Sequence, residues 1–553
     1  MKKFLIAFAA LILLLLGFYG YQTYTELRGA GPAFFRKPAG DITKLINEQN
    51  ERYSDWQQSN DDNRESQFEN PNFPLSLPPG FQITVFADNL SQARVMAFDH
   101  RGNLWVSRTR EGIVTMLDIE DGEVVGRANI FTGLKNPHGL VFDYREPGML
   151  YLALEDGIYR APVYRPGICE TPDADCKTMT DIELVQVSLA LSSSILPAKI
   201  IDLPDGGGHR NHFTRTIKFG PDDKLYVSIG SSCNVCEEED DRRAKIFRMD
   251  RDGSNWEEVA SGLRNTVFFD WSYVTGDMWG ADMGRDQLGD DLPPDEINII
   301  ERGKQYGWPI CYGKQIHDTD FDTKQYIRNP CEDTEPSYID LPAHVAPLGI
   351  AFVPEEGWPE EYWYDLLVAY HGSWNSKDPV GYKIERLRLS ADGSYVGAVP
   401  FIDGFLAANK SAAYGRPVDI ITQPGGVMYV SDDHAGVIYR VWYTPQQGRW
   451  CYSDKVCIDT VLEGEKNIQI RGSVRGVWSF EASFPITINL VSGAVVESYG
   501  TLEGDWMTED YVPFHANISI PAGEEVASIT LRKDNPSGLP EFDDEVTVSP
   551  DAI

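Results

Sequence analysis

The sequence has few positive charges for its length. Of its 553 residues, 49 are Lys or Arg and 84 are Asp or Glu, giving a formal net charge of −35. Such a chain repels phosphate backbones and anionic lipid surfaces, so we expect no nucleic-acid partner. The acidic balance favours a soluble surface. The sequence shows no particular run of acidic residues that would support a face for docking a basic electron carrier.

Cysteine is also scarce, and its spacing excludes one cofactor. No Cys-x-x-Cys-His occurs, which excludes a covalent c-type haem. In an exported protein, short spacings favour disulfides. Zinc is the alternative for Cys233-Asn-Val-Cys236, but no second Cys-x-x-Cys or paired histidine stands near it. The eight cysteines form four local pairs: Cys169/Cys176, Cys233/Cys236, Cys311/Cys331 and Cys451/Cys457.

Long apolar runs are missing except at the start of the chain. Lys2 and Lys3 precede an apolar run from Phe4 to about Tyr19, which predicts an export signal over residues 1–21. No small-x-small cleavage site and no lipoprotein cysteine follow. An uncleaved anchor and a cleaved signal both stay open, and we favour the anchor. We therefore expect a periplasmic protein held at the inner membrane, or a secreted one if cleaved, with residues 22–78 as a polar linker.

From residue 79 the pattern is all-β, and it repeats. Each repeat is a strand, a turn with Gly, Pro or Asp, and a second strand ending in small or polar residues. Six units predict a six-bladed β-propeller over residues 79–445, with insertions around 157–205, 285–345 and 372–410. The first strands of the repeats begin at Arg94, Pro137, Thr214, Arg264, Ala346 and Gly415.

The end of the chain differs from the repeats. Residues 446–553 contain short alternating runs, which predict a small antiparallel β-sandwich-like domain without a cluster of catalytic type. We expect a structural or docking role for it. The runs begin at Asn467, Ile486, Asn517 and Val526.

The same position in every repeat is expected to face the propeller axis. The first strand of each blade lines the channel, so its first residues converge although they are scattered in sequence. Most are Arg or His in a strongly acidic protein, which favours an anionic ligand. The positions are Arg94, His138, His212, Arg215, Arg264, Asn265, His344 and Arg416, with Asp282, Gly284, His371 and Asp433 from the ends of the second strands.

Several long motifs carry a family resemblance over residues 80–443. The chain resembles the sorbosone-dehydrogenase branch of the soluble pyrroloquinoline-quinone (PQQ) glucose dehydrogenases. The motifs are specific to the family but say little about which substrate is oxidised. They are His212-Phe-Thr-Arg-Thr-Ile-Lys-Phe-Gly-Pro-Asp with Lys224-Leu-Tyr-Val-Ser-Ile-Gly, Gly262-Leu-Arg-Asn265, Asp290-Asp-Leu-Pro-Pro-Asp-Glu-Ile-Asn298, Tyr306-Gly-Trp-Pro309, His371-Gly-Ser-Trp-Asn375 and Gly415-Arg-Pro-Val.

The resemblance implies two cofactors, PQQ and Ca²⁺. PQQ is a planar tricarboxylate quinone, for which guanidinium forks are suited. The residues implied to contact it are Arg94, His138, Arg264, Asn265, His371 and Arg416. The calcium ligands implied are the main-chain carbonyls of Gly284 and Arg285, because hard cations prefer oxygen. Asp286, Asp290 and Asp291 are expected to be solvated loop acids, with the binding of a further ion as the alternative.

The resemblance also implies an oxidation of an aldose or sorbosone-like sugar. His212 is the implied general base and Arg264 the group that stabilises negative charge. Gly206-Gly-Gly-His209 keeps His209 as a second candidate, and Asn211 departs from the Asp of many family members. Without haem, electrons must leave to an external acceptor, a cytochrome or a quinone. For His138, His344 and His371 a structural imidazole stays the alternative, and for Trp374 we expect core packing.

Two other functions fit the same fold. A metal-dependent lactonase or esterase would place carboxylate and amide ligands at the axis, which the Arg and His content disfavours. A non-catalytic propeller that presents an acidic binding surface would need no cationic channel.

Overall fold

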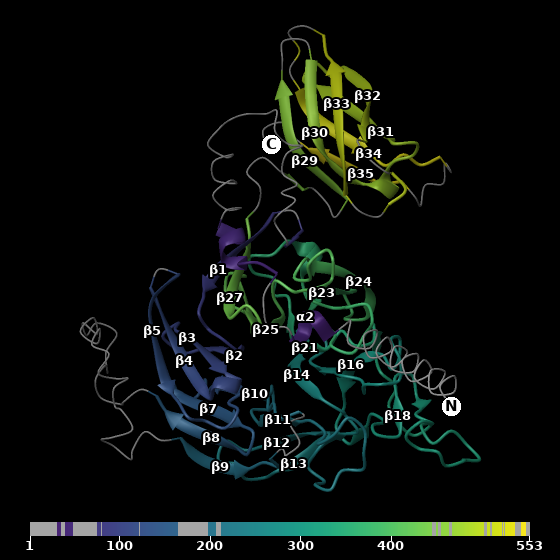
Figure 1. Ribbon diagram of the computed structural model, residues 1–553. Helices are drawn as coiled ribbons and strands as arrows, with labels where there is room; N and C mark the ends of the chain where they lie inside the picture. The colour runs from purple at the N-terminus through teal and green to yellow at the C-terminus, as the bar shows by residue number, and fades with distance from the viewer. Residues whose placement is uncertain are drawn as a thin grey trace, which may run out of the picture. The chain divides into compact units, whose positions relative to one another are not determined.

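Strands make up almost all of the regular structure (Figure 1). The computed structural model describes residues 30–34, 39–47, 75–78, 80–120, 122–163, 197–205, 212–444, 450–451, 455–463, 467–502, 506–508, 511–521, 524, 526–536 and 543–548. The chain forms two compact units, residues 1–443 and residues 444–553.

Six sheets of the first unit are the blades of a propeller. The first is β2 (Ala93–Phe98), β3 (Leu104–Arg108), β4 (Ile113–Glu120) and β5 (Glu123–Phe131). The second is β6 (Gly139–Phe142), β7 (Met149–Leu154), β8 (Gly157–Pro162) and β9 (Ala198–Asp202). The third is β10 (Ile217–Phe219), β11 (Leu225–Ile229), β12 (Lys245–Met249) and β13 (Glu257–Ser261), with β17 (Lys304–Gln305) added in parallel.

The remaining blades follow the same antiparallel plan. The fourth is β14 (Thr266–Trp271), β15 (Met278–Asp282), β16 (Asp295–Ile300) and β20 (Ile339–Leu341). The fifth is β21 (Pro347–Phe352), β22 (Leu366–Tyr370), β23 (Lys383–Leu389) and β24 (Tyr395–Ile402). The sixth is β25 (Pro417–Thr422), β26 (Met428–Asp432), β27 (Val437–Tyr443) and β1 (Phe81–Ala87). The predicted six-bladed propeller is confirmed.

The ring is closed by a strand from the start of the propeller. β1 pairs antiparallel with β27, from Phe81 opposite Tyr443 to Ala87 opposite Ile438. This pairing covers the edge of β27, which would otherwise present unpaired main-chain groups. Neighbouring blades pack against one another around a circle through the contacts of β2 with β6, β6 with β10, β11 with β14, β14 with β21, and β25 with both β21 and β2.

Apolar side chains between blades form the core. Trp105 and Trp279 are each 1% exposed, and Leu150 and Val368 are fully buried in the same cluster. Each such aliphatic side chain contributes about 1.5–3 kcal/mol through burial. Because the blades are wedged against one another, the loops at the end of the channel stand on a rigid base.

Part of the sequence predicted as a linker packs against this propeller. Ile42 and Ile46, in a helical stretch at 42–47, are buried in the core cluster that includes Phe81. The short helix α2 (Gly31–Phe34) contacts the propeller through Ala33, whose carbonyl oxygen lies 3.5 Å from Arg416 Nη1. Among the described residues, no helix has the length and apolar character that crossing a membrane requires. The predicted signal or anchor, residues 1–21, lies outside the described residues.

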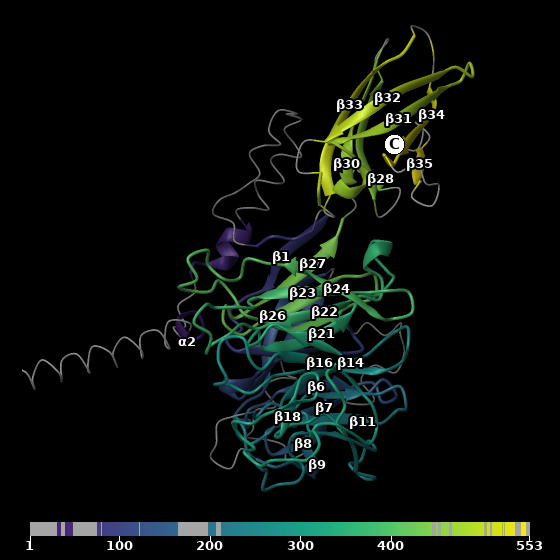
Figure 2. The same cartoon turned by 90° about the vertical axis from the view of Figure 1, so that its right-hand side faces the viewer.

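The second unit is a separate antiparallel sheet, and its all-β prediction is confirmed (Figure 2). Its strands surround one apolar core that includes Trp478 and Phe484. The sheet order is β28 (Trp450–Cys451), β29 (Val456–Glu463), β30 (Asn467–Arg475), β33 (Tyr511–Ser519), β32 (Val495–Leu502), β31 (Ser483–Leu490), β34 (Val526–Arg532) and β35 (Glu545–Val548).

Two of the predicted cysteine pairs are disulfides of the propeller. Cys233–Cys236 and Cys311–Cys331 are bonded, so the first pair is not a zinc site. Cys451 faces Cys457 in the register of β28 and β29. Cys169 and Cys176 lie outside the described residues.

Candidate functional site

One face of the propeller collects the starts of the innermost strands and the ends of the second strands. Because these strands are antiparallel, Arg94 at the start of β2 and Arg416 before β25 lie on the same face as Asp433, which follows β26. Hydrogen bonds on this face cross from blade to blade. The predicted convergence of residues far apart in sequence is therefore observed.

Asp433 joins two of the predicted residues. Its Oδ2 accepts a hydrogen bond from Arg94 Nη1 at 2.6 Å, and its Oδ1 accepts one from His371 Nε2 at 2.8 Å. The three side chains are only 12–14% exposed. A carboxylate shared by a guanidinium and an imidazole fixes both groups at the axis.

Burial and charge set the protonation of this group. Burial acts to raise the pKa of Asp433, but the imidazole and two guanidinium groups around it outweigh burial and hold that pKa far below its usual range. Burial, together with Arg416, lowers the pKa of His371 to about 4. At neutral pH the arrangement is thus an ionised Asp433 with a neutral His371 that keeps its proton on Nε2.

Arg416 donates to main-chain oxygens around the same loop. Its Nε and Nη2 bond the carbonyl oxygens of His371 and Gly372 at 2.9 and 2.6 Å. Its Nη1 lies 3.5 Å from the carbonyl oxygen of Ala33 in α2. The guanidinium therefore holds the 371–372 turn and brings the N-terminal segment to the axial face.

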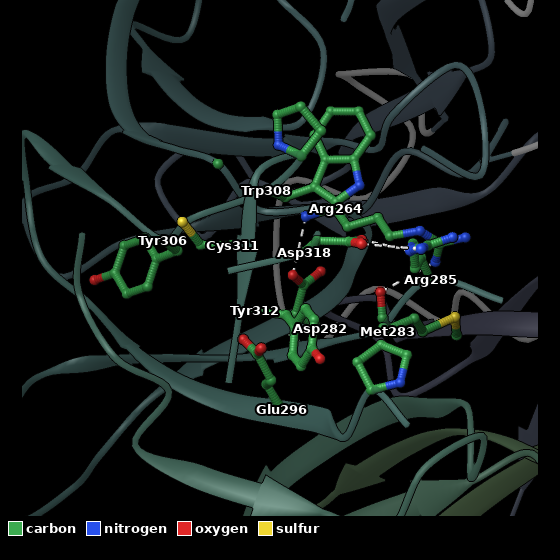
Figure 3. Close-up of a pocket in the computed structure, with 14 residues that line it drawn as sticks. Arg264, Asp282, Met283, Arg285, Glu296, Tyr306, Trp308, Cys311, Tyr312 and Asp318 are labelled. Atoms are coloured by element: carbon green, nitrogen blue, oxygen red, sulfur yellow. Dashed lines mark hydrogen bonds and ion pairs between the residues drawn. The ribbon is translucent and has the colours of Figure 1, made fainter. Parts of the chain in front are cut away.

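Arg264 is a deeply buried cation of the site, with a side chain 6% exposed. Its Nε and Nη2 bond the carbonyl oxygen and Oδ1 of Asn234, each at 2.9 Å. Its Nη1 bonds the carbonyl oxygen of Met283 at 3.0 Å (Figure 3). Asp286 Oδ2 is 3.7 Å from Nη2. The fork is held in one orientation by main-chain and amide oxygens.

Asp282 at the end of β15 supports the turn that carries Arg264. Its carboxylate accepts the main-chain N–H groups of Arg264 at 2.9 Å and Asn265 at 2.6 Å. Burial raises the pKa of Asp282 to about 6. A side chain at Gly230 would collide with Asn265 and with His212 Cβ, so the absence of one lets these two residues approach.

The Gly284–Arg285 turn is anchored on both sides. The N–H of Gly284 donates to Asp295 Oδ1 at 2.8 Å, and Arg285 forms a two-pronged pair with Asp318 at 2.5 and 3.0 Å. A Cβ at position 284 would lie 2.7 Å from the carbonyl oxygen of Pro294. Within the described residues, the carbonyl oxygens of Gly284 and Arg285 accept no hydrogen bond.

His212 has a defined tautomer. Its Nδ1 lies 3.0 Å from the carbonyl oxygen of Ser231, which can only accept, so Nδ1 carries the proton. Ser231 Oγ, 2.8 Å from the same nitrogen, gives its own proton to the carbonyl oxygen of Cys233. Burial and the nearby Arg264 lower the pKa of His212 well below its usual value. Neutral imidazole with a free Nε2 lone pair is the state of a general base.

The other two predicted histidines occupy different settings. His138 is fully buried against Phe268, and its Nε2 has no hydrogen-bond partner among the described residues. Burial lowers its pKa well below the usual value. His344 Nε2 lies 2.7 Å from the carbonyl oxygen of Gly289 and so fixes the loop after Arg285.

Two expectations from the sequence are wrong. Trp374 is 41% exposed and contacts the ring of Phe34 edge-on, so it is not a core residue. Its position on the loop after β22, next to solvent, prevents core packing. Asp286 is not a solvated acid, because Asn375 donates to its Oδ1 at 2.8 Å and burial raises its pKa.

Sequence reasoning missed the residues that support the site. Asn234 contacts both Arg264 and Asp286, Ser231 orients His212, and Asp295 holds Gly284. The one signal in the sequence was the position of Asn234 between two cysteines that a disulfide would fix. His209 and Asn211 lie outside the described residues.

Comparisons with known proteins agree with this fold. The TrAA12-like family matches residues 199–444. An uncharacterized protein of Borreliella burgdorferi is 34% identical over 375 residues, covering 67% of this chain and 91% of that protein. A protein of Coprinopsis cinerea named pyrroloquinoline quinone-dependent pyranose dehydrogenase is 23% identical over 438 residues, covering 67% of this chain and 55% of that protein.

Solved structures show the same propeller. The calcium structure of the Trichoderma reesei carbohydrate-active enzyme of family AA12 has a TM-score of 0.53 at 19% identity and covers 67% of this chain and 97% of its own. The holo form of the pyranose dehydrogenase PQQ domain from Coprinopsis cinerea has a TM-score of 0.51 at 19% identity and covers 66% and 97%. By its sequence identity, this chain belongs to the family of the Borreliella burgdorferi protein, and its residues 199–444 match the TrAA12-like family.

Proposed function

We propose that this protein is a PQQ-dependent sugar dehydrogenase that oxidises an aldose or sorbosone-like sugar with the help of Ca²⁺. The single observation that carries the proposal is His212, held as a neutral imidazole beside the buried guanidinium of Arg264, with an Nε2 that makes no hydrogen bond to the described residues. The TrAA12-like match and the name of the Coprinopsis cinerea relative support the same chemistry.

The residues present fit a planar tricarboxylate. Three guanidinium groups, Arg94, Arg264 and Arg416, and the imidazole of His371 stand on one face, where the carboxylates of Asp433, Asp286 and Asp282 lie against them. The buried Arg94 Nε has no hydrogen-bond partner among the described residues, so it remains as a donor. Arg94, His138, Arg264, Asn265, His371 and Arg416 would hold PQQ.

The carbonyl oxygens of Gly284 and Arg285, which accept no hydrogen bond from the part of the chain that the structure describes, fit a calcium ion. They are hard ligands on a turn fixed by Asp295 and Asp318. PQQ, when bound with Ca²⁺, supplies a polarised quinone carbonyl that accepts a hydride. The chain itself supplies the other requirements of the reaction.

His212 is the group that takes the proton. Its Nε2 would accept the proton of the sugar hydroxyl, while Nδ1–H stays on the carbonyl oxygen of Ser231 and prevents the ring from turning. Arg264 stabilises negative charge next to it. Its three hydrogen bonds to Asn234 and Met283 keep it in place without a structural change during the reaction.

A lactonase-type metal site is disfavoured by the state of the axial carboxylates. Asp433 is shared by Arg94 and His371, and Asp282 accepts two main-chain N–H groups. Asp286 is bonded to Asn375. Each of these acids is thus engaged, whereas a propeller lactonase needs free carboxylates at the axis.

Electrons would leave to an external cytochrome or quinone. We also propose that the protein is periplasmic and held at the inner membrane by residues 1–21, or secreted if that segment is cleaved. An export signal with lysines before an apolar run supports this location.

The test is reduction of an artificial dye by purified apo-protein given PQQ, Ca²⁺ and a panel of aldoses and sorbosone. His212→Ala should bind PQQ as wild type does and lose about 10²–10⁴-fold in kcat, the usual contribution of a general base. His317→Ala is the matched control, since His317, in the hairpin of β18 (Cys311–Tyr312) and β19 (Ile316–His317), pairs with Asp322 of the loop that follows. If His209→Ala is inactive and His212→Ala is active, the base is His209.

A further inference from the structure

A short disulfide loop follows β11 on the axial face. Cys233 and Cys236 are three residues apart and bonded, with their Cα atoms 6.2 Å apart. Both cysteines are half-buried, and neither takes part in the chemistry described above. Asn234 lies inside the loop, and Ser231 lies two residues before it.

Asn234 makes four hydrogen bonds to the site. Its carbonyl oxygen and Oδ1 accept from Arg264 Nε and Nη2, each at 2.9 Å. Its Oδ1 also accepts the N–H of Asp286 at 2.7 Å, and its Nδ2 donates to the carbonyl oxygen of Asp286 at 3.0 Å. Both its side-chain polar atoms are used, so one residue links Arg264 to the loop that follows Gly284 and Arg285.

The same loop supports His212 from its other end. The carbonyl oxygen of Cys233 accepts the hydroxyl proton of Ser231 at 2.8 Å, and Ser231 Oγ accepts from His212 Nδ1 at 2.8 Å. Base and guanidinium are therefore held by one turn. A disulfide across four residues restricts the main-chain torsions of that turn, and so restricts the spacing between the two groups.

We propose that Asn234, fixed by the Cys233–Cys236 disulfide, is a positioning residue that holds Arg264 and, through Ser231, His212 in one reactive arrangement. This inference rests on the proposed function. It differs from a merely stabilising disulfide, because the effect of its loss should fall on cofactor binding and turnover rather than on unfolding.

Four variants test this proposal, each assayed without reductant. Asn234→Leu keeps the size of the side chain and removes its hydrogen bonds. Asn234→Asp keeps the acceptor for Arg264 and for the N–H of Asp286. Cys233→Ser/Cys236→Ser opens the turn. Cys311→Ser/Cys331→Ser is the matched control, because it removes a disulfide of larger separation, whose loss should destabilise the chain more.

Two quantities should change together in the first and third variants. PQQ affinity, measured by fluorescence titration of calcium-loaded apo-protein, should fall about 10–100-fold, the range for loss of a supporting contact. The kcat for the best sugar should fall about 10²-fold, as expected from a misplacement near 1 Å. Asn234→Asp should recover at least part of both losses. The control should keep wild-type affinity and kcat despite a lower melting temperature.

The pH profile of kcat/KM adds a readout that stability alone would not move. Arg264, Arg243 and Arg215 all face His212 and lower its pKa. Loosening Arg264 weakens one of these effects, so in Asn234→Leu the acid limb should move to higher pH.

Three outcomes overturn the inference. Asn234→Leu and Cys233→Ser/Cys236→Ser could keep wild-type affinity and kcat. Alternatively, Cys311→Ser/Cys331→Ser could lose as much PQQ affinity and kcat, or Asn234→Asp could recover neither. A wild-type protein that binds no PQQ would overturn the proposed function itself and this inference with it.

Discussion

Replacement of Asp433 by Ala removes the carboxylate shared by Arg94 and His371. The two hydrogen bonds, at 2.6 and 2.8 Å, join side chains that are only 12–14% exposed. The variant therefore leaves a largely buried guanidinium without its counter-charge and a buried imidazole N–H without an acceptor.

The expected loss can be worked from these contacts. A hydrogen bond to a charged group contributes about 1.5–3 kcal/mol, so two contribute about 3–6 kcal/mol. Removing one member of a buried ion pair costs about 3–5 kcal/mol. We expect the free energy of unfolding of the propeller to fall by about 3–5 kcal/mol at pH 7.

The pH dependence of this loss has a definite sign. The folded-state pKa of Asp433 is depressed, so its stabilisation is present above the unfolded pKa, about 3.9, and is lost as pH falls through the folded pKa. The difference between wild type and Asp433→Ala should thus stay constant from pH 7 down to about 4 and shrink only below that.

The assay is urea unfolding followed by tryptophan fluorescence, as a double-mutant cycle with Arg94→Ala. Coupling between positions 94 and 433 should be about 1.5–3 kcal/mol. Asp365→Ala is the matched control, since Asp365 is 2% exposed and pairs with Arg386 of β23 at 2.5 Å. Asp365→Ala should lower the free energy of unfolding. In the double variant, its loss and that of Arg94→Ala should sum to within about 0.5 kcal/mol, which means no coupling. Zero coupling between Arg94 and Asp433, or no loss of stability in Asp433→Ala, would refute the reasoning.

Three further predictions concern protonation and metal. Because burial and Arg264 lower the pKa of His212, the acid limb of kcat/KM in wild type should lie below about pH 6.5, the ordinary pKa of histidine, and a limb above about 7 would contradict the assignment. Burial raises the pKa of Asp419 to about 7. The stabilisation by the protonated carboxyl is therefore present below about pH 4 and is lost as the pH rises through 7. In the same urea assay, Asp419→Asn should gain stability relative to wild type between about pH 4 and 8. A calcium chelator should weaken PQQ binding, and Asp295→Ala, which frees the N–H of Gly284, should raise the calcium concentration needed to restore it by about 10–100-fold.

The repeats were predictable because they depend on local patterns. Alternating apolar residues and a turn define two strands of each blade, and all twelve predicted strands are present, from β2 and β3 to β25 and β26. The closure by β1 was not predicted, since no local pattern reveals that Phe81 will pair with Tyr443. Such pairing depends on the geometry of the complete ring.

The cationic residues of the site were predictable for the same reason. Their positions repeat with the blades, so Arg94, Arg264 and Arg416 align with one another in the sequence alone. Their partners do not repeat. Asn234, Ser231 and Asn375 come from loops of different length, and a loop's hydrogen bonds depend on the fold around it.

Direct binding of PQQ tests the central claim most simply. Calorimetric titration of PQQ into the calcium-loaded apo-protein should show one molecule bound per chain with a Kd in the micromolar range or tighter. Arg264→Ala should weaken that binding at least about 10-fold, the cost of one charge-assisted hydrogen bond. No binding by wild type at micromolar PQQ would contradict the account.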